Sequence, residues 1–285
     1  MRLVFSLLVL SWSAVPLFAA DDAERLLSAG QEALLRNDFD RASELGKQAL
    51  ALAKQEVEKE PKDASAWLRL GRAHELLGQH REAIIDCSRA IELDPKEAAA
   101  YDLRGSEQFK LGRLTESLAD FDRFLKLKPD ASAGHWKRGI TLYYLGKYDE
   151  GRKQFEGYEK VDTNDVENAV WHFLCVARKD GVAKARASLL KIGKDQRVPM
   201  MDVYALFAGK AKPEEVLQAA EAGRPTAAQK NARLFYAHLY LGLYHEAQGN
   251  AELARKHLGE ATDNHRVGHY MWDVARVHRD LLRKK

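Results

Sequence analysis

The stretch HWKRGITLYYLGKYDEG, at residues 135–151, contains residue types from which a ligand site could be built. Its aromatic side chains could stack on a flat ligand, and its Gly146-Lys147 pair resembles part of a phosphate-binding loop. Such a loop needs a longer glycine-rich run before the lysine and a Ser or Thr directly after it. Tyr148 follows Lys147 instead. The stretch therefore predicts no phosphate site.

Other motifs that carry chemistry are missing from the sequence. It contains no HExxH, no GxSxG, no paired CxxC and no acidic calcium-binding loop. We therefore predict that the protein is not an enzyme, that it has no catalytic residue and no metal site, and that it needs no cofactor.

Histidines are concentrated near the C-terminus, where His265 and His269 stand four residues apart and would share one face of a helix. A metal site would usually add cysteine or carboxylate ligands at fixed spacing. We therefore expect these side chains to pack or to lie on the surface. The group consists of His238, His245, His257, His265, His269 and His278.

The composition favours a helical protein that binds no nucleic acid. The chain of 285 residues is 46% hydrophobic and 31% charged, and it has only seven prolines. Its formal net charge is +3, with both signs interspersed along the chain. A nucleic-acid binder would gather its basic residues on one face. The only basic block is the short C-terminal end, residues 283–285, which is typical of a solvated helix terminus.

The opening stretch belongs to a sequence repeat. Residues 64–97, 98–131 and 132–163 align with one another at a spacing of about 34 residues. Small residues recur at three positions of each unit, and proline ends the first two units. The positions in register are Gly71, Gly105 and Gly139, then Gly78, Gly112 and Gly146, then Ala83, Ser117 and Gly151.

This pattern resembles the tetratricopeptide repeat, in which each unit is a pair of antiparallel helices, A and B. The first small residue lets the two helices approach closely, and the second glycine ends helix A in a left-handed cap. The resemblance implies an all-α fold, an α-solenoid of helix-turn-helix repeats with a C-terminal capping helix. In this register Cys87 and Cys175 lie in non-adjacent units, so we expect two buried thiols and no disulfide.

Four segments follow from this register. Residues 1–20 are predicted to be a signal peptide, and residues 21–163 an N-terminal array. Residues 164–230 lose the period and predict a degenerate helical segment. Residues 231–285 predict one more repeat and the capping helix. The units of the N-terminal array are expected at about 23–61, 64–97, 98–131 and 132–163.

The N-terminal stretch MRLVFSLLVLSWSAVPLFAA has one basic residue, an apolar run and small residues before Asp21. This pattern is typical of a secretory signal peptide cleaved after Ala19 or Ala20. The alternative is an uncleaved anchor, although the run falls short of the ~20 residues that span a bilayer. No cysteine follows the run to carry a lipid, so we expect no direct lipid anchor. The predicted location is periplasmic or secreted.

Stacked helix pairs form a superhelix whose concave face is lined mainly by the A helices. Aromatic and apolar anchors among a few charges suit an extended or helical peptide. We therefore expect protein or peptide partners in the cell envelope to bind this face. The residues expected there are Leu68, Arg72, Glu75, Leu76, Asp102, Ser106, Phe109, Lys110, Trp136, Ile140, Tyr143 and Tyr144.

A closer resemblance rests on residues 135–181, HWKRGITLYYLGKYDEGRKQFEGYEKVDTNDVENAVWHFLCVARKDG, and on the later LFYAHLYLGLYHEAQGNAELARKHLGEA unit. Together they resemble, in order, elements of the periplasmic tetratricopeptide family of new lipoprotein I. The resemblance implies a homodimeric envelope adaptor that presents peptidoglycan hydrolases to one another or to a processing protease. The missing lipid-bearing cysteine is a departure from that family.

Three functions remain open at this point. The first is a non-catalytic adaptor or scaffold, and the second is an assembly factor of an envelope complex. The third is a carbohydrate- or peptidoglycan-binding module that uses Trp136, Tyr143 and Tyr144 as stacking surfaces.

The second helix of the first unit is about two turns longer than the repeat requires, through residues 51–60. Leu52 and Val57 give this extension apolar positions, so we expect it to pack against another surface. That surface is either the next repeat or the same helix of a second chain. Two-fold dimers are the commonest closed assembly, and we therefore predict a homodimer that uses this region.

Overall fold

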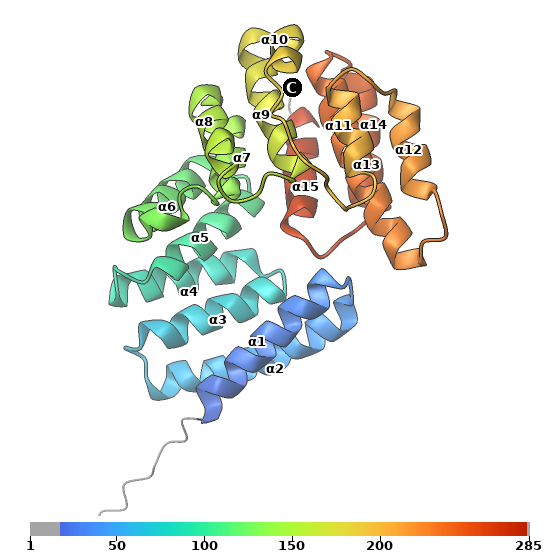
Figure 1. The fold of residues 1–285 in the computed structure, drawn as a ribbon. Helices are drawn as coiled ribbons and strands as arrows, with labels where there is room; N and C mark the ends of the chain where they lie inside the picture. The colour runs from blue at the N-terminus through green and yellow to red at the C-terminus, as the bar shows by residue number, and fades with distance from the viewer. Residues whose placement is uncertain (1–17, 284–285) are drawn as a thin grey trace, which may run out of the picture.

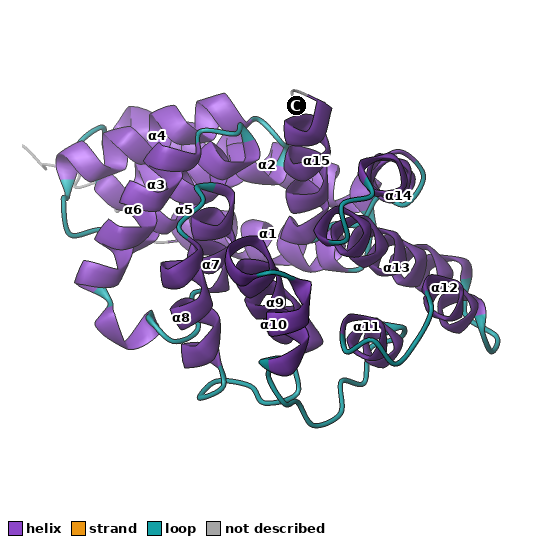
Figure 2. Cartoon of the chain, turned by 90° about the horizontal axis from the view of Figure 1, so that it is seen from above, coloured by secondary structure: helices purple, strands orange, loops and turns teal. Residues whose placement is uncertain are grey.

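The computed structural model describes residues 18–283, and this part of the chain is helical without a strand, as expected (Figures 1 and 2). The helices of the first four pairs are α1 (Phe18–Leu35) with α2 (Phe39–Lys59), α3 (Ala64–Leu76) with α4 (His80–Leu93), α5 (Ala98–Lys110) with α6 (Leu114–Leu127), and α7 (Trp136–Tyr144) with α8 (Tyr148–Tyr158). The later helices are α9 (Val166–Asp180), α10 (Val182–Ala187), α11 (Met200–Phe207), α12 (Pro213–Glu221), α13 (Ala227–Ala247), α14 (Ala251–Asp263) and α15 (Tyr270–Arg283).

The turns between paired helices have the predicted left-handed glycines. A residue with a side chain adopts a positive φ only at a cost, whereas glycine does so freely. Gly78, Gly112, Gly146 and Gly249 have φ angles of 70°, 73°, 73° and 80°. Each of these glycines lies just after helix A, in the short turn before helix B.

The first glycine of each aligned unit lies where helix A crosses helix B, as predicted. A Cβ atom placed on Gly105 would lie 2.9 Å from the ring of Phe121, and one on Gly139 would lie 2.6 Å from Phe155. The same crossing recurs at Gly242, where the distance to Leu258 is 2.7 Å. The last repeat therefore uses the same packing as the N-terminal units.

The long α2 helix packs on the next unit of the same chain. Ala53, in the extension, is completely buried. Glu56 lies 2.6 Å from Arg69 of α3, and the indole of Trp67 donates a 3.0 Å hydrogen bond to the carbonyl of Pro61. The surface that receives the extension within the chain is therefore α3.

The unit at residues 132–163 begins irregularly. A short 3₁₀ turn, η1 (Pro129–Ala131), precedes α7. His135 is the N-cap of α7, and its Nδ1 accepts a 3.2 Å hydrogen bond from the amide of Arg138. Helix α7 consequently has nine residues, whereas α3 and α5 have thirteen each.

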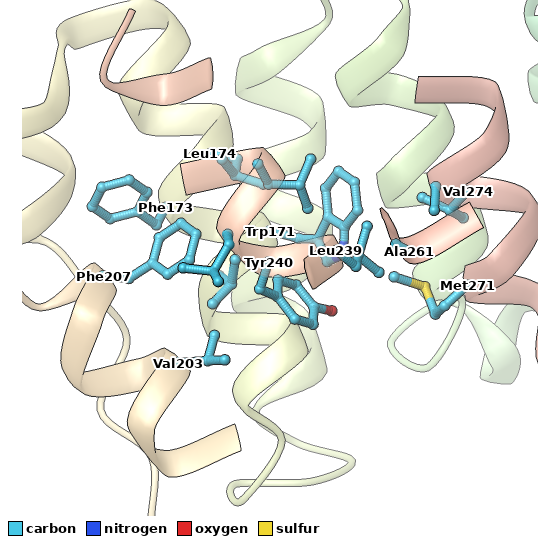
Figure 3. Close-up of a cluster of buried hydrophobic side chains, with 14 of the residues drawn as sticks. Trp171, Phe173, Leu174, Val203, Phe207, Leu239, Tyr240, Ala261, Met271 and Val274 are labelled. Atoms are coloured by element: carbon cyan, nitrogen blue, oxygen red, sulfur yellow. The ribbon is translucent and has the colours of Figure 1, made fainter. Parts of the chain in front are cut away.

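The main hydrophobic core lies around α9, in the segment that loses the repeat period. Trp171 of α9 lies in one cluster with Phe207 of α11, Tyr240 of α13 and Met271 of α15 (Figure 3). Helix α9 also packs on α8 and α10. The aperiodic segment thus joins the N-terminal array to the C-terminal unit through one continuous core.

The chain curves until its C-terminal unit touches its first turn. The amide of Gly268, in the loop before α15, donates a 2.8 Å hydrogen bond to Oδ1 of Asn37. The guanidinium of Arg266 lies 4.4 Å from the ring centroid of Phe39. Figure 1 shows α15 in the middle of the molecule, enclosed by the curve of the other helices.

Two smaller predictions concern the cysteines and the N-terminus. Cys87 and Cys175 are both free and completely buried, as expected. Residues 1–17 of the predicted signal peptide lie outside the described residues, and its last three residues open α1. Within residues 18–283, no helix combines the length and the apolar content needed to cross a bilayer.

Candidate functional site

The residues predicted to line the concave face lie on α3, α5 and α7, but their exposure differs. Ser106, Phe109, Lys110, Ile140 and Tyr143 are buried, each with at most 7% of its surface exposed. The others are partly buried, except Leu76, which is also buried. Much of this face is therefore covered in the folded chain.

Most of the charged side chains on this face pair with the neighbouring repeat. Arg72 lies 2.6 Å from Glu24 of α1, and Nζ of Lys110 lies 3.1 Å from Glu75. Lys137 Nζ lies 2.6 Å from Asp102 and 2.9 Å from the hydroxyl of Ser106. These pairs connect successive A helices and hold the units in register.

The pairs also determine the charge states of the buried groups. Burial alone would raise the pKa of Asp102, but the hydrogen bond from His135 and the charge of Lys137 lower it to about 2. Burial opposes the charge of Lys110, but Glu107, whose carboxylate lies 2.5 Å away, and Glu75 raise its pKa. Both side chains are therefore charged at neutral pH.

Helix α15 covers the middle of this face. The ring of Tyr270 lies between two predicted site residues, with centroid distances of 5.5 Å to Phe109 and 5.4 Å to Trp136. The ammonium groups of Lys110 and Lys137 lie 5.8 and 5.9 Å from the same ring. A tyrosine of the chain itself thus occupies a position expected for a partner's side chain.

Two further side chains of α15 contact the same face. The guanidinium of Arg276 donates a 2.6 Å hydrogen bond to the carbonyl of Lys110. The ring nitrogen Nδ1 of His278 lies 2.9 Å from the hydroxyl of Tyr144. Helix α15 is the expected capping helix and packs on α14, but its contacts with α5 and α7 were not foreseen.

These contacts define residues that sequence reasoning missed: Tyr270, Arg276 and His278. Their helix is amphipathic, and an aromatic residue begins it, but no sequence signal indicates which surface it covers. The stacking surfaces suggested for a carbohydrate are also taken up by packing. Tyr143 is buried beside Trp171, at a centroid distance of 5.4 Å, and Trp136 faces both Tyr270 and His269.

The histidines near the C-terminus do not form a metal centre. Among residues 18–283, no group of His, Cys, Asp and Glu side chains could hold a metal ion. His265 and His269 lie in the loop before α15, so the expectation that they share a helix face is wrong. His238, His245 and His257 stack between α13 and α14, with His238 and His257 joined at 2.9 Å between their Nδ1 atoms.

A cavity of about 180 Å³ lies next to the covered face, at the amino-terminal end of α9. Trp136 and Ile140 of α7 line one side, and Trp171 of α9 lines another. Asp165 and Arg197 bring charged groups to it. Of the predicted site residues, only Trp136 and Ile140 reach this cavity.

Two family models match the chain. Residues 64–97 match the tetratricopeptide repeat, and residues 103–166 match a second tetratricopeptide repeat model. These residues therefore form tetratricopeptide repeats, as their glycine register predicted. Among curated proteins, none matches the chain.

Several solved structures are similar to the chain. A tetratricopeptide repeat protein from Parabacteroides merdae is 18% identical with a TM-score of 0.48, covering 92% of this chain and 99% of its own. The pilF protein of Pseudomonas aeruginosa is 12% identical with a TM-score of 0.46, covering 94% and 99%. YrrB, described as having an unusual peptide-binding site, is 15% identical with a TM-score of 0.45, covering 79% and 96%.

Proposed function

We propose that the protein is a non-catalytic adaptor that binds protein partners through the inner face of its repeat array. This proposal rests on one observation: the inner face binds α15, a helix of the same chain. An amphipathic helix lies on it, with one aromatic ring between Phe109 and Trp136 and a guanidinium on the end of α5. Binding of an amphipathic helix in a groove is a recurring mode of peptide recognition.

Part of the face remains available beside α15. Leu68 and Arg72 of α3 are partly buried, and among the described residues α15 has no hydrogen bond, ion pair or ring contact to either. We propose that a partner engages this N-terminal part of the face, with or without displacement of α15.

We further propose that the adaptor works in the cell envelope after export. The predicted signal peptide supports this location, and the resemblance to the new lipoprotein I family favours cell-wall hydrolases or a processing protease as partners. N-terminal sequencing of the protein from cell fractions tests the location. A mature chain that begins at Ala20 or Asp21 in the soluble envelope fraction supports it, and an intact Met1 in the cytoplasm contradicts it.

Site-specific photo-crosslinking in the native host tests the adaptor function. A crosslinking amino acid replaces Leu68 on the inner face, and in a matched control it replaces Ile85 of α4, whose side chain is 65% exposed. We expect a protein to be captured at position 68 and not at position 85, and to bind the purified chain. Equal capture at both positions, or none, would contradict an adaptor that uses this face.

A further inference from the structure

The cavity at the start of α9 has more negative than positive charge. Arg197 lies among the charged side chains at this cavity. The guanidinium of Arg197 lies 2.7 Å from Asp165, 2.5 Å from Glu167 and 2.6 Å from Asp195. Three carboxylates therefore surround one cation. The N-terminus of α9 offsets about half a unit charge. Burial, followed by the neighbouring charge of Glu167, raises the pKa of Asp165, although Arg197 opposes both effects.

Two residues that line the cavity carry buried polar atoms without a hydrogen-bond partner among the described residues. The side chain of Asn168 is buried, and its Nδ2 donates a 2.9 Å hydrogen bond to the carbonyl of Phe155. Its Oδ1 has no hydrogen-bond partner among the described residues, and neither has Nε1 of Trp171, which is 1% exposed. A buried donor or acceptor without a hydrogen-bond partner lowers the stability of the folded protein. A ligand that both donates and accepts hydrogen bonds would satisfy them.

The walls of the cavity suit a cation. Trp136, Tyr158 and Trp171 supply aromatic surfaces, and the face of an aromatic ring attracts an ammonium group within about 6 Å. The volume of about 180 Å³ is below the ~300–1,000 Å³ typical of sites for drug-sized ligands. The space therefore fits one side chain or one chain terminus.

An outer hollow of about 580 Å³ adjoins the cavity and shares Tyr158, Asp165 and Arg197 with it. Asp162 and Lys194 line its outer part. The hollow can therefore hold a peptide backbone whose cationic group enters the inner cavity.

We propose that this cavity binds the ammonium group of a peptide, either a lysine side chain or a free amino terminus. The ammonium donates hydrogen bonds to Asp165 and to Oδ1 of Asn168, and a carbonyl of the peptide accepts one from Nε1 of Trp171. This site deepens the adaptor function, on which it rests, by naming a feature of the partner. It is separate from the inner face near Leu68, so either site can fail its own test while the other passes.

Titration of the protein without its first 20 residues by short peptides tests this site. The probes are an alanine tripeptide amide with a free amino terminus, an acetylated tripeptide with a central lysine, and an acetylated tripeptide with a central norleucine. The readout is the NMR signal of the indole N–H groups of Trp136 and Trp171. We expect saturable shifts with at least one ammonium-bearing probe and none with the norleucine peptide, and the two charged probes distinguish the two sources of the ammonium.

Equal shifts with the norleucine peptide would overturn the proposal, as would a response to N-acetylglucosamine alone or no saturable shift with any probe. These outcomes need only the unmodified protein. Because they concern purified components, they are also independent of whether a partner is captured at position 68 in cells.

Two matched variants locate the binding. Asp165 is the N-cap of α9, and its side chain accepts a hydrogen bond from the amide of Glu167. Since asparagine caps helices as well as aspartate does, Asp165→Asn removes the charge and keeps the cap. We expect Asp165→Asn to bind the peptide about tenfold more weakly, because it loses one hydrogen bond between the ammonium and a charged group. The control is Asp149→Asn, an exposed residue that pairs with Lys179 at the other end of α9. Unchanged affinity in Asp165→Asn, or equal weakening in both variants, would refute the assignment.

Discussion

Gly105 lies where α5 crosses α6, and its small size sets the distance between the two helices. A Cβ atom there would come within 2.9 Å of the Phe121 ring and 3.2 Å of Cβ of Asp120. We therefore expect Gly105→Val to lower the free energy of unfolding by about 1–3 kcal/mol, the usual cost of overpacking. Thermal denaturation followed by circular dichroism measures the change.

A matched glycine serves as the control for this prediction. Gly259 lies inside α14, and a Cβ atom placed on it would meet nothing within 4 Å. Since alanine favours a helix more than glycine does, Gly259→Ala should leave stability unchanged or raise it by up to about 1 kcal/mol. If Gly105→Val melts at the same temperature as the unmodified protein, the close crossing of α5 and α6 is wrong.

His257 makes the α13–α14 pair sensitive to acid. Burial, followed by the charges of His238 and His245, lowers its pKa from 6.5 to about 4. Below pH 6.5 the unfolded chain therefore binds more protons at this residue than the folded chain does. Acidification stabilises the state that binds more protons, which here is the unfolded chain. The free energy of unfolding should therefore fall as the pH drops from 6.5 to about 4.

Chemical denaturation across this pH range measures the effect. In His257→Gln the side chain no longer titrates, so the loss of stability between pH 6.5 and 4 should be smaller than in the unmodified protein. The same loss in both proteins would show that other groups cause the acid sensitivity.

At the scale of the helices, the ring of Tyr270 is the largest of the side chains that hold α15 to the array. Tyr270 lies between Phe109 and Trp136, next to the ammonium groups of Lys110 and Lys137. Replacing it with alanine removes this aromatic contact and leaves a cavity. We expect Tyr270→Ala to cost roughly 3 kcal/mol, within the range known for removal of large core side chains, and to loosen α15 more than the repeats.

Hydrogen exchange followed by mass spectrometry can resolve this difference between elements. In Tyr270→Ala, amides of residues 270–283 should exchange faster, while those of α3 and α4 keep their rates. Leu281, which lies on α15 and is only partly buried, offers a control in Leu281→Ala. Uniform acceleration along the whole chain would mean that α15 is an integral part of the fold and cannot be released alone.

The sequence predicted the repeats well and the place of α15 poorly, for a physical reason. The spacing of Gly71, Gly105 and Gly139 reflects contacts between helices that are neighbours in the chain, so it is visible as a local period. The contact of Tyr270 with Phe109 joins residues 161 positions apart, and a single sequence records no trace of such pairing. The cavity next to α9 was missed for the same reason, since Trp136, Asp165 and Arg197 come from three separate segments.

At the scale of the molecule, the curvature of the array and the return of α15 belong together. A Cβ atom on Gly268 would lie 2.0 Å from the carbonyl oxygen of Leu34, so the loop before α15 passes directly over the end of α1. Together with the hydrogen bond from Gly268 to Asn37, this contact joins the first and last repeats. The inner face is therefore bounded by elements from both ends of the chain.

The assembly state depends on whether α2 needs a second chain. The sequence left two surfaces for the apolar extension of α2, the next repeat or a second chain, and favoured a homodimer. Within the chain, Ala53 is buried and Glu56 pairs with Arg69 of α3. Leu52 and Val57 are partly buried. Because packing within the chain accounts for the extension, we expect multi-angle light scattering to give the mass of one chain throughout the micromolar range. A mass of two chains that persists on dilution would contradict this, and Leu52→Glu would then show whether α2 forms the contact.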